Sequence, residues 1–124
     1  ISGRDAAFLS EIVRGVVRNR EYLDYVISRY SKIKLKKISV LIKNILRMGL
    51  YQIFFMDKVP ESAAVNESVV LSRRYGHSSS SGFVNAILRK YQEKEKYELD
   101  IDSLLAGADS KKVKPKYWIR NFED

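Results

Sequence analysis

One long apolar stretch, ISVLIKNILRMGLYQIFFM at residues 38–56, constrains the fold more than any other part of this sequence. Its nineteen residues would be long enough to cross a bilayer as a helix. Lys43 and Arg47 stand four residues apart within it, and both would be costly in a hydrocarbon core. From Met48 onward the stretch is apolar nearly all round, which is typical of a buried central helix. We therefore expect the centre of a helical bundle and no membrane partner.

The rest of the chain shows the same helical spacing, with apolar residues three and four positions apart. This spacing predicts helices at 4–19, 20–32, 38–56, 61–76 and 78–91. The serines at 78–81 follow Gly76, a natural helix end, and are good N-cap residues, so they predict a helix start and not a linker. KIKLKK at 32–37 alternates as a strand would, but a lone strand has no partner, and we predict a loop. The fold class is therefore all-α, with about six helices.

The composition changes after Tyr91, where the sequence becomes polar: QEKEKYELDID. We divide the chain into a compact domain at 1–95 and a linker at 96–124. The linker is predicted to hold a short helix around 103–106 and another after Pro115, where aromatic residues recur at helical spacing.

Several kinds of chemistry are excluded by the residues that the chain lacks. It has no cysteine, which rules out disulfides, thiolate metal sites and a cysteine nucleophile. A single histidine, His77 beside Gly76, is expected to be an exposed turn residue. We find no Walker loop, GxGxxG or HExxH motif and no secretory signal, and we expect a cytoplasmic protein without catalytic, cofactor or metal site of its own.

Positive charge is strong and unevenly distributed. The formal net charge is +8, of which residues 1–60 carry +7 and residues 61–124 carry +1. A basic half indicates a polyanionic partner such as RNA, although net charge alone also keeps proteins soluble. Five cations between Arg29 and Lys37 meet no acid, which favours phosphate contact there. Cations at helix ends also have a second explanation, since they suit the helix dipole.

The candidate RNA contacts are Arg14, Arg18, Arg20, Lys32, Lys34, Lys36, Lys37, Lys43, Arg47, Arg73, Arg74, Arg89 and Lys90.

Two polar residues are predicted to be structural. On a helical wheel Glu67 lies within the apolar arc of the 61–76 segment, where a carboxylate needs hydrogen-bond partners or an exit to solvent. Asn85 lies at the edge of the stripe of the next helix. Because buried polar groups are paired, we expect Asn85 to bond to the preceding helix, with Asn66 and Glu67 as candidate partners.

Three stretches taken together resemble the NusB-like family. In chain order they are DAAFLSEIVRGVVRNREYLDYVI, ILRMGLYQIFFMDKVPESAAVNESVVLSRRYG and GFVNAILRKY, within residues 5–91. The resemblance implies a NusB-like helical bundle that binds RNA. The family usually begins with one more helix before the Arg-Asp-Ala segment, whereas this sequence opens at ISGRD. We expect that first helix to be missing, and the apolar groove left behind to admit a second copy of the chain as a dimer.

The family has two main branches. One is a free-standing transcription antitermination factor that binds RNA with a ribosomal-protein partner. The other is the N-terminal domain of the RsmB (Sun) type of methyltransferase, which makes 5-methylcytosine in small-subunit ribosomal RNA. The methyltransferase branch typically carries arginine where Arg89 stands, and the tail KPKYWIRNFED looks like the segment that leads into its catalytic domain.

The resemblance thus favours an RNA-positioning domain of a ribosomal RNA cytosine-5 methyltransferase, with the antitermination factor as the alternative. In the first case the S-adenosylmethionine site and the catalytic cysteine would lie in a covalently attached domain beyond Asp124. This chain alone would then be non-catalytic and would contain no cofactor.

Overall fold

The computed structural model describes the backbone of residues 2–106 and the side chains of residues 2–94. Its elements are α1 (Gly3–Arg18), α2 (Arg20–Tyr30), a 3-10 turn η1 (Leu35–Lys37), α3 (Val40–Phe55), α4 (Glu61–Tyr75) and α5 (Ser80–Ala106). Over this range there are five α-helices and no strand, which confirms the all-α prediction. The helix expected after Pro115 lies outside the described residues.

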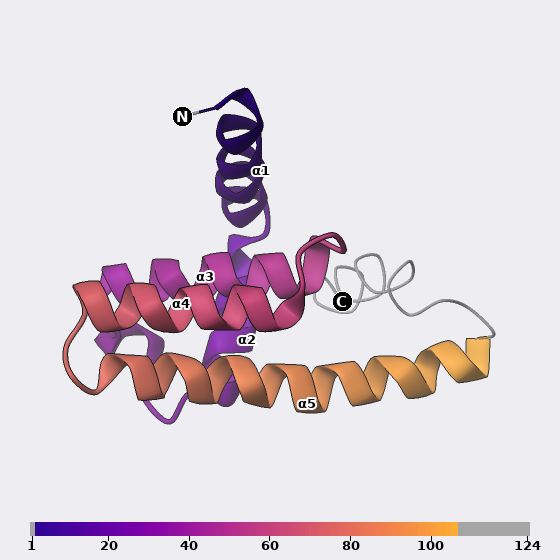
Figure 1. Ribbon diagram of the computed structural model, residues 1–124. Helices are drawn as coiled ribbons and strands as arrows, with labels where there is room; N and C mark the ends of the chain where they lie inside the picture. Colours follow the sequence, from indigo (N-terminus) through magenta and orange to yellow (C-terminus); the bar gives the residue numbers. More distant parts are fainter. Residues whose placement is uncertain (1, 107–124) are drawn as a thin grey trace.

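Four of the helices form a bundle from which the fifth stands out. Figure 1 shows α3, α4 and α5 side by side, each antiparallel to the next, with α2 crossing behind them. Helix α1 rises from this bundle at a steep angle. None of the described helices is both long and apolar enough to cross a bilayer.

The core lies around α3, as the apolar stretch predicts. Leu46, Leu50 and Phe54 are at most 1% exposed and pack with buried residues of α2, α4 and α5. Burying side chains of this size stabilises the fold by about 1.5–3 kcal/mol each. Ser39 starts α3, because its hydroxyl accepts a hydrogen bond from the Ile42 N–H at 3.2 Å.

Small residues form the buried face of α4. Ala64, Ser68 and Ser72 are at most 3% exposed and recur every fourth position. Both serine hydroxyls donate to backbone carbonyls of their own helix, at 2.8 Å, so neither is left unpaired. A β-carbon added at Gly49 of α3 would lie 2.5 Å from the Ser68 Oγ. Helices α3 and α4 therefore approach closely because neither carries a large side chain at this point.

The serine run starts α5, as predicted. Ser80 accepts a hydrogen bond from the His77 N–H at 2.9 Å and is 8% exposed, so the run forms a fixed turn. Helix α5 then continues to Ala106 and passes residue 95, where we placed a domain boundary, without a break. The short helix expected around 103–106 is the end of α5 and not a separate element.

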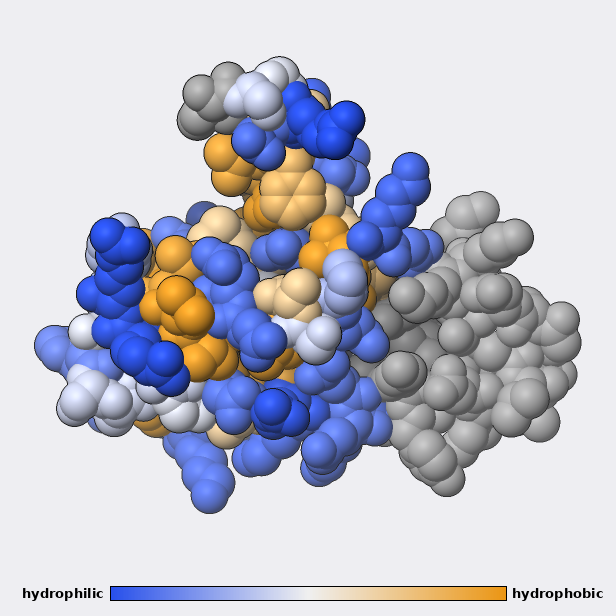
Figure 2. Space-filling model, in the orientation of Figure 1, coloured by the Kyte–Doolittle hydropathy of each residue, from blue (hydrophilic) through white to orange (hydrophobic). Residues whose placement is uncertain are grey.

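The first helix packs on α3 through its C-terminal half, most closely at Gly15. Gly15 is buried, and any β-carbon there would overlap the ring of Tyr51 on α3. This close approach explains a glycine inside a helical pattern. Most of the apolar stripe of α1 remains exposed: Leu9 is 50% exposed and Val13 58%. Figure 2 shows these apolar surfaces along α1 and in the corner where it meets the bundle.

Candidate nucleic-acid interface

Three elements bring positive charge to one end of the bundle. Because α3 and α4 are antiparallel, α3 begins where α4 ends, and α5 begins there too (Figure 1). η1 immediately precedes the N-cap of α3. We call this region the basic end, and its cations are Lys36, Lys37, Lys43, Arg73 and Arg74.

Acidic residues are absent from the segments that meet there. The sequence has no Asp or Glu between Asp24 and Asp57, and none between Glu67 and Glu93. The fold brings parts of these two acid-free stretches together at the basic end. This signal is present in the sequence, but its meaning depends on knowing which helix ends are neighbours.

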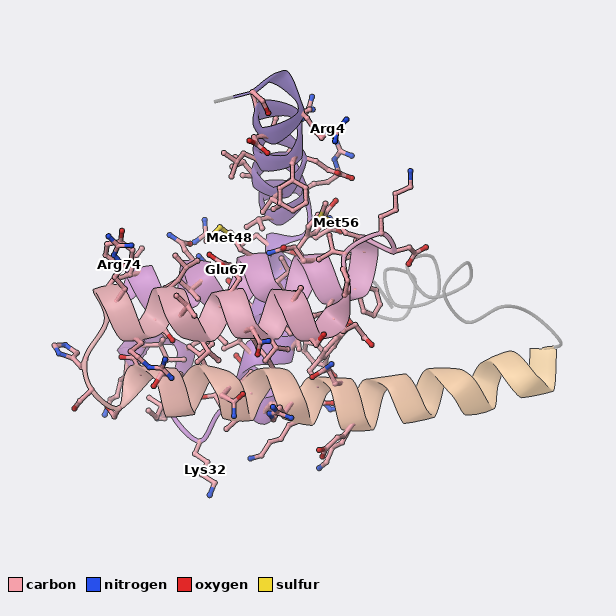
Figure 3. The ribbon with its side chains drawn as sticks, viewed as in Figure 1. Arg4, Lys32, Met48, Met56, Glu67 and Arg74 are labelled. Carbon is pink, nitrogen blue, oxygen red and sulfur yellow. The ribbon has the colours of Figure 1, made fainter. Side chains whose placement is uncertain are left out.

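The side chains of the basic end are available to a ligand. Lys36, Lys37, Arg73 and Arg74 are exposed, and Lys43 is half-buried. In Figure 3 Arg74 projects outward from the last turn of α4. Closely spaced cations without acids attract phosphates at long range and hold them in contact through charge-assisted hydrogen bonds.

Other candidate cations lie elsewhere on the surface. Arg14, Arg18 and Arg20 are exposed around the junction of α1 and α2, and Lys32 and Lys34 are exposed in the segment that precedes η1. Lys32 points away from Arg74 in Figure 3. The structure therefore does not gather all candidates into one surface.

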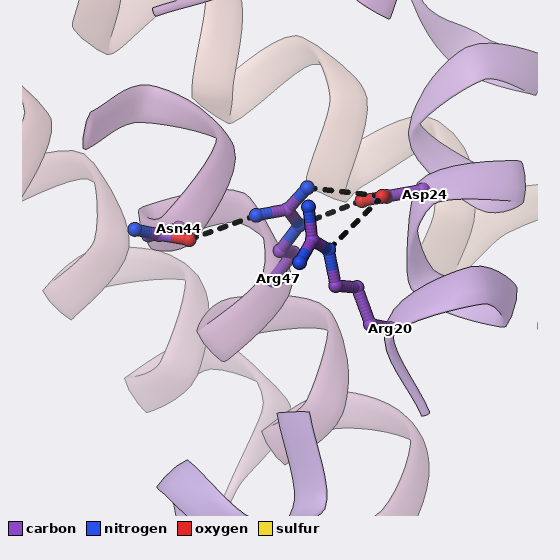
Figure 4. A network of polar contacts seen from close by, with 4 residues as sticks. All are labelled: Arg20, Asp24, Asn44 and Arg47. Carbon is purple, nitrogen blue, oxygen red and sulfur yellow. Dashed lines mark hydrogen bonds and ion pairs between the residues drawn. The ribbon is translucent and has the colours of Figure 1, made fainter. Parts of the chain in front are cut away.

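Arg47 does not belong to any exposed surface, and its assignment as an RNA contact is corrected. It is 5% exposed, and its Nε and Nη2 donate to the two carboxylate oxygens of Asp24 at 2.6 and 2.9 Å. Its Nη1 donates to the Asn44 Oδ1 at 2.9 Å (Figure 4). Arg20 shares the same carboxylate at 3.8 Å. This guanidinium ties α3 to α2, and because it is buried and already bonded through all three nitrogens it is not accessible to a phosphate.

Comparison with known proteins agrees with the fold. The sequence pattern of the NusB family matches residues 1–93. The chain belongs to the NusB family. It is 39% identical over 99 residues to the transcription antitermination protein NusB of Desulforudis audaxviator, a match that covers 78% of this chain and 72% of that one. NusB of T. maritima has a similar solved structure, with a TM-score of 0.71 at 30% identity, covering 78% of this chain and 72% of that one.

The second branch of the NusB family also appears among the relatives. A probable ribosomal RNA small subunit methyltransferase B of Synechocystis is 39% identical over 95 residues. That match covers 77% of this chain but only 21% of the methyltransferase, so most of the methyltransferase lies outside the match.

The two residues predicted to be structural in this NusB-family domain are not paired with each other. The Asn85 Oδ1 accepts from the Nε of Arg89, one turn later on the same helix, at 3.1 Å. Glu67 is exposed on α4, and in Figure 3 it lies at the outer edge of that helix near Met48. The predicted interhelical bond between these two described side chains is therefore not formed. The helical wheel was misleading because two residues of the apolar arc around Glu67, Ala63 and Val70, are exposed and do not face the core.

Arg89 is exposed and Lys90 is half-buried on α5. His77 is exposed in the turn between α4 and α5, as expected. Within the described residues no three His, Cys, Asp or Glu side chains cluster as metal ligands would.

Proposed function

We propose that this NusB-family domain binds RNA through its basic end and acts in transcription antitermination. The basic end supports the proposal most directly, since two acid-free stretches converge there on exposed lysines and arginines. The antitermination role is supported by the relatives named transcription antitermination protein NusB. The match to the D. audaxviator protein covers 72% of that protein's length. As a cytosolic RNA-binding factor, the domain would need no cofactor.

Binding at the basic end would be mainly electrostatic. Each phosphate neutralised by a lysine or arginine releases counterions, so affinity should fall linearly with salt on logarithmic axes, by a slope of about 0.7 per contact for single strands. Such contacts fix the position of the RNA but carry little sequence information.

Charge reversal tests the proposal on two matched pairs of exposed lysines. Lys36→Glu with Lys37→Glu changes the basic end, whereas Lys58→Glu with Lys94→Glu makes the same change in net charge elsewhere. Fluorescence anisotropy with a labelled RNA oligonucleotide should show a large loss of affinity and a shallower salt slope for the first pair only. Equal effects of the two pairs would mean that net charge matters and the basic end does not.

A second function is favoured by one residue and one relative. Arg89 matches the arginine typical of the methyltransferase branch, and the Synechocystis methyltransferase is 39% identical over 95 residues. In that case the domain would position ribosomal RNA for a covalently attached catalytic domain that uses S-adenosylmethionine.

The size of the natural protein separates the two functions. An immunoblot of source cells with an antibody to this domain should give a band only slightly larger than 14.4 kDa for an antitermination factor. A band several domains larger would instead assign the domain to a methyltransferase, and the search for the catalytic cysteine would move to the additional sequence.

A further inference from the structure

An exposed tyrosine stands within the basic end. Tyr75 is the last residue of α4 and is 58% exposed, which makes it the most exposed aromatic residue among the described side chains. The sequence offers only a weak signal for it, an aromatic residue after two arginines and before a helix-ending glycine. Single exposed apolar side chains are common on protein surfaces, so the surroundings of the ring decide whether it has a role.

The ring of Tyr75 is partly ordered by its neighbour. The guanidinium carbon of Arg74 lies 5.5 Å from the ring centroid, a cation–π contact at an exposed site. This contact limits the rotamers of both side chains, so a ligand that stacks there loses less conformational freedom on binding. The arginine also brings a charge close to whatever the ring contacts.

The surroundings of Tyr75 select the kind of ligand. Arg73 and Arg74 precede the ring in the last turn of α4, the η1 lysines lie at the same end of the bundle, and Gly76 and the serines that follow add no acid. Val40, Leu41 and Val70 are also exposed on α3 and α4, at 66%, 44% and 49%. A protein partner would use those apolar side chains, but an aromatic ring set among unopposed cations is the combination that binds nucleic acid strands.

We propose that Tyr75, held by Arg74, is a stacking platform for an unpaired base of single-stranded RNA, while Arg73 and the η1 lysines take the adjacent phosphates. This inference rests on the proposed RNA-binding function and narrows it to single strands. Bases inside an A-form duplex are already stacked on each other, so only an unpaired base can lie on the ring.

The test separates base stacking from phosphate binding. The full chain is titrated with a labelled RNA of about ten nucleotides and with an abasic strand of the same number of phosphates, a length within the usual site size. Tyr75→Ala should weaken binding of the RNA by about fivefold or more and leave binding of the abasic strand unchanged. Tyr75→Phe should restore the loss, since the ring and not the hydroxyl stacks.

Tyr25→Ala is the matched control, because Tyr25 is 47% exposed on α2, away from the end of α4. It should affect neither ligand. If Tyr75→Ala leaves RNA affinity unchanged, or weakens both ligands equally, the stacking platform is refuted although RNA binding stands, and the exposed valines and leucine would remain for a protein partner. If the unaltered chain binds neither strand, the proposed function itself fails.

Discussion

Helices α1 and α3 have the same length and both carry apolar residues at helical spacing, but α1 has one apolar face whereas α3 is apolar nearly all round from Met48 onward, and the two are buried to different extents. Each has sixteen residues with apolar positions at helical spacing. Eight residues of α3 are buried, but only Ile12 and Gly15 of α1 are. Helix α3 packs against α1, α2, α4 and α5, whereas α1 packs mainly on α3. Hydrophobic spacing thus identifies the face that a helix can bury, while burial depends on how many neighbours reach that face.

The largest effect should come from the ion pair that fixes α3 to α2. Asp24→Ala leaves Arg47 buried with Asn44 as its remaining partner, and we expect a loss of about 3–5 kcal/mol in the free energy of unfolding. Urea denaturation followed by circular dichroism measures this loss. Glu21→Ala, an exposed acid on the same helix, should change stability little. Replacing both partners, Asp24→Leu with Arg47→Met, should recover most of the loss; failure to do so would show that the charges themselves are needed.

A pair of leucine substitutions tests the contrast between the two helices directly. Leu50→Ala in α3 removes a side chain that is 1% exposed, and should cost about 2–5 kcal/mol of stability because a cavity remains. Leu9→Ala in α1 removes a side chain that is 50% exposed, and should cost about 0.5 kcal/mol or less. Equal losses in denaturation experiments would mean that the face of α1 is covered in solution.

Gly15 tests the close contact between α1 and Tyr51 of α3. Gly15→Ala places a methyl group where the Tyr51 ring lies, and should destabilise the protein by about 1–3 kcal/mol through overpacking. Gly3→Ala is the matched control, since nothing lies within 4 Å of its added β-carbon. Thermal denaturation should show a lower midpoint for the first variant only. If Gly15→Ala is neutral, α1 is not held by this contact.

The smallest effect is a pH dependence at the same contact. Burial raises the pKa of Tyr51, and the Glu11 carboxylate adds to this, while Arg18 opposes it. A raised pKa in the folded state means that the neutral phenol favours folding. This contribution is complete below the unfolded pKa of about 10 and is lost as the pH rises above it. Tyr51→Phe should therefore lose less stability than the unaltered protein on raising the pH from about 9 to about 11. Parallel curves in denaturation experiments would contradict the assignment.

The sequence predicted the helices well because their signals are local. The predicted bounds of α3 and α4 fall within two residues of those observed, since Ser39 and Gly76 mark the helix ends through their own chemistry. The serine run was assigned correctly for the same reason. Local spacing could not show that Ser68 and Ser72 face the core, because small hydroxyl residues can be buried once they bond to their own backbone.

The candidate site was harder to predict because its residues are distant in sequence. Arg47 looked like a surface cation beside Lys43, and its partner Asp24 lies 23 residues earlier on another helix. The extent of exposure along the apolar face of α1 could not be predicted from spacing for a related reason, since a helix alone does not reveal how many neighbours it will have. Spacing within one helix specifies neither the partner of Arg47 nor the exposure of α1. Both depend on which helices are neighbours in the fold.

The short connections of the bundle bear on how it folds. Only residues 56–60 join α3 to α4, and 76–79 join α4 to α5, so each helix packs on the one made just before it. Contacts between segments close in sequence form rapidly, because little loop entropy is lost when they meet. The bundle can therefore assemble as successive hairpins while the chain emerges during synthesis. The basic end draws its five cations from η1, α3 and α4, so it is complete when the first hairpin closes, and a growing chain would display its full charge cluster before α5 has packed.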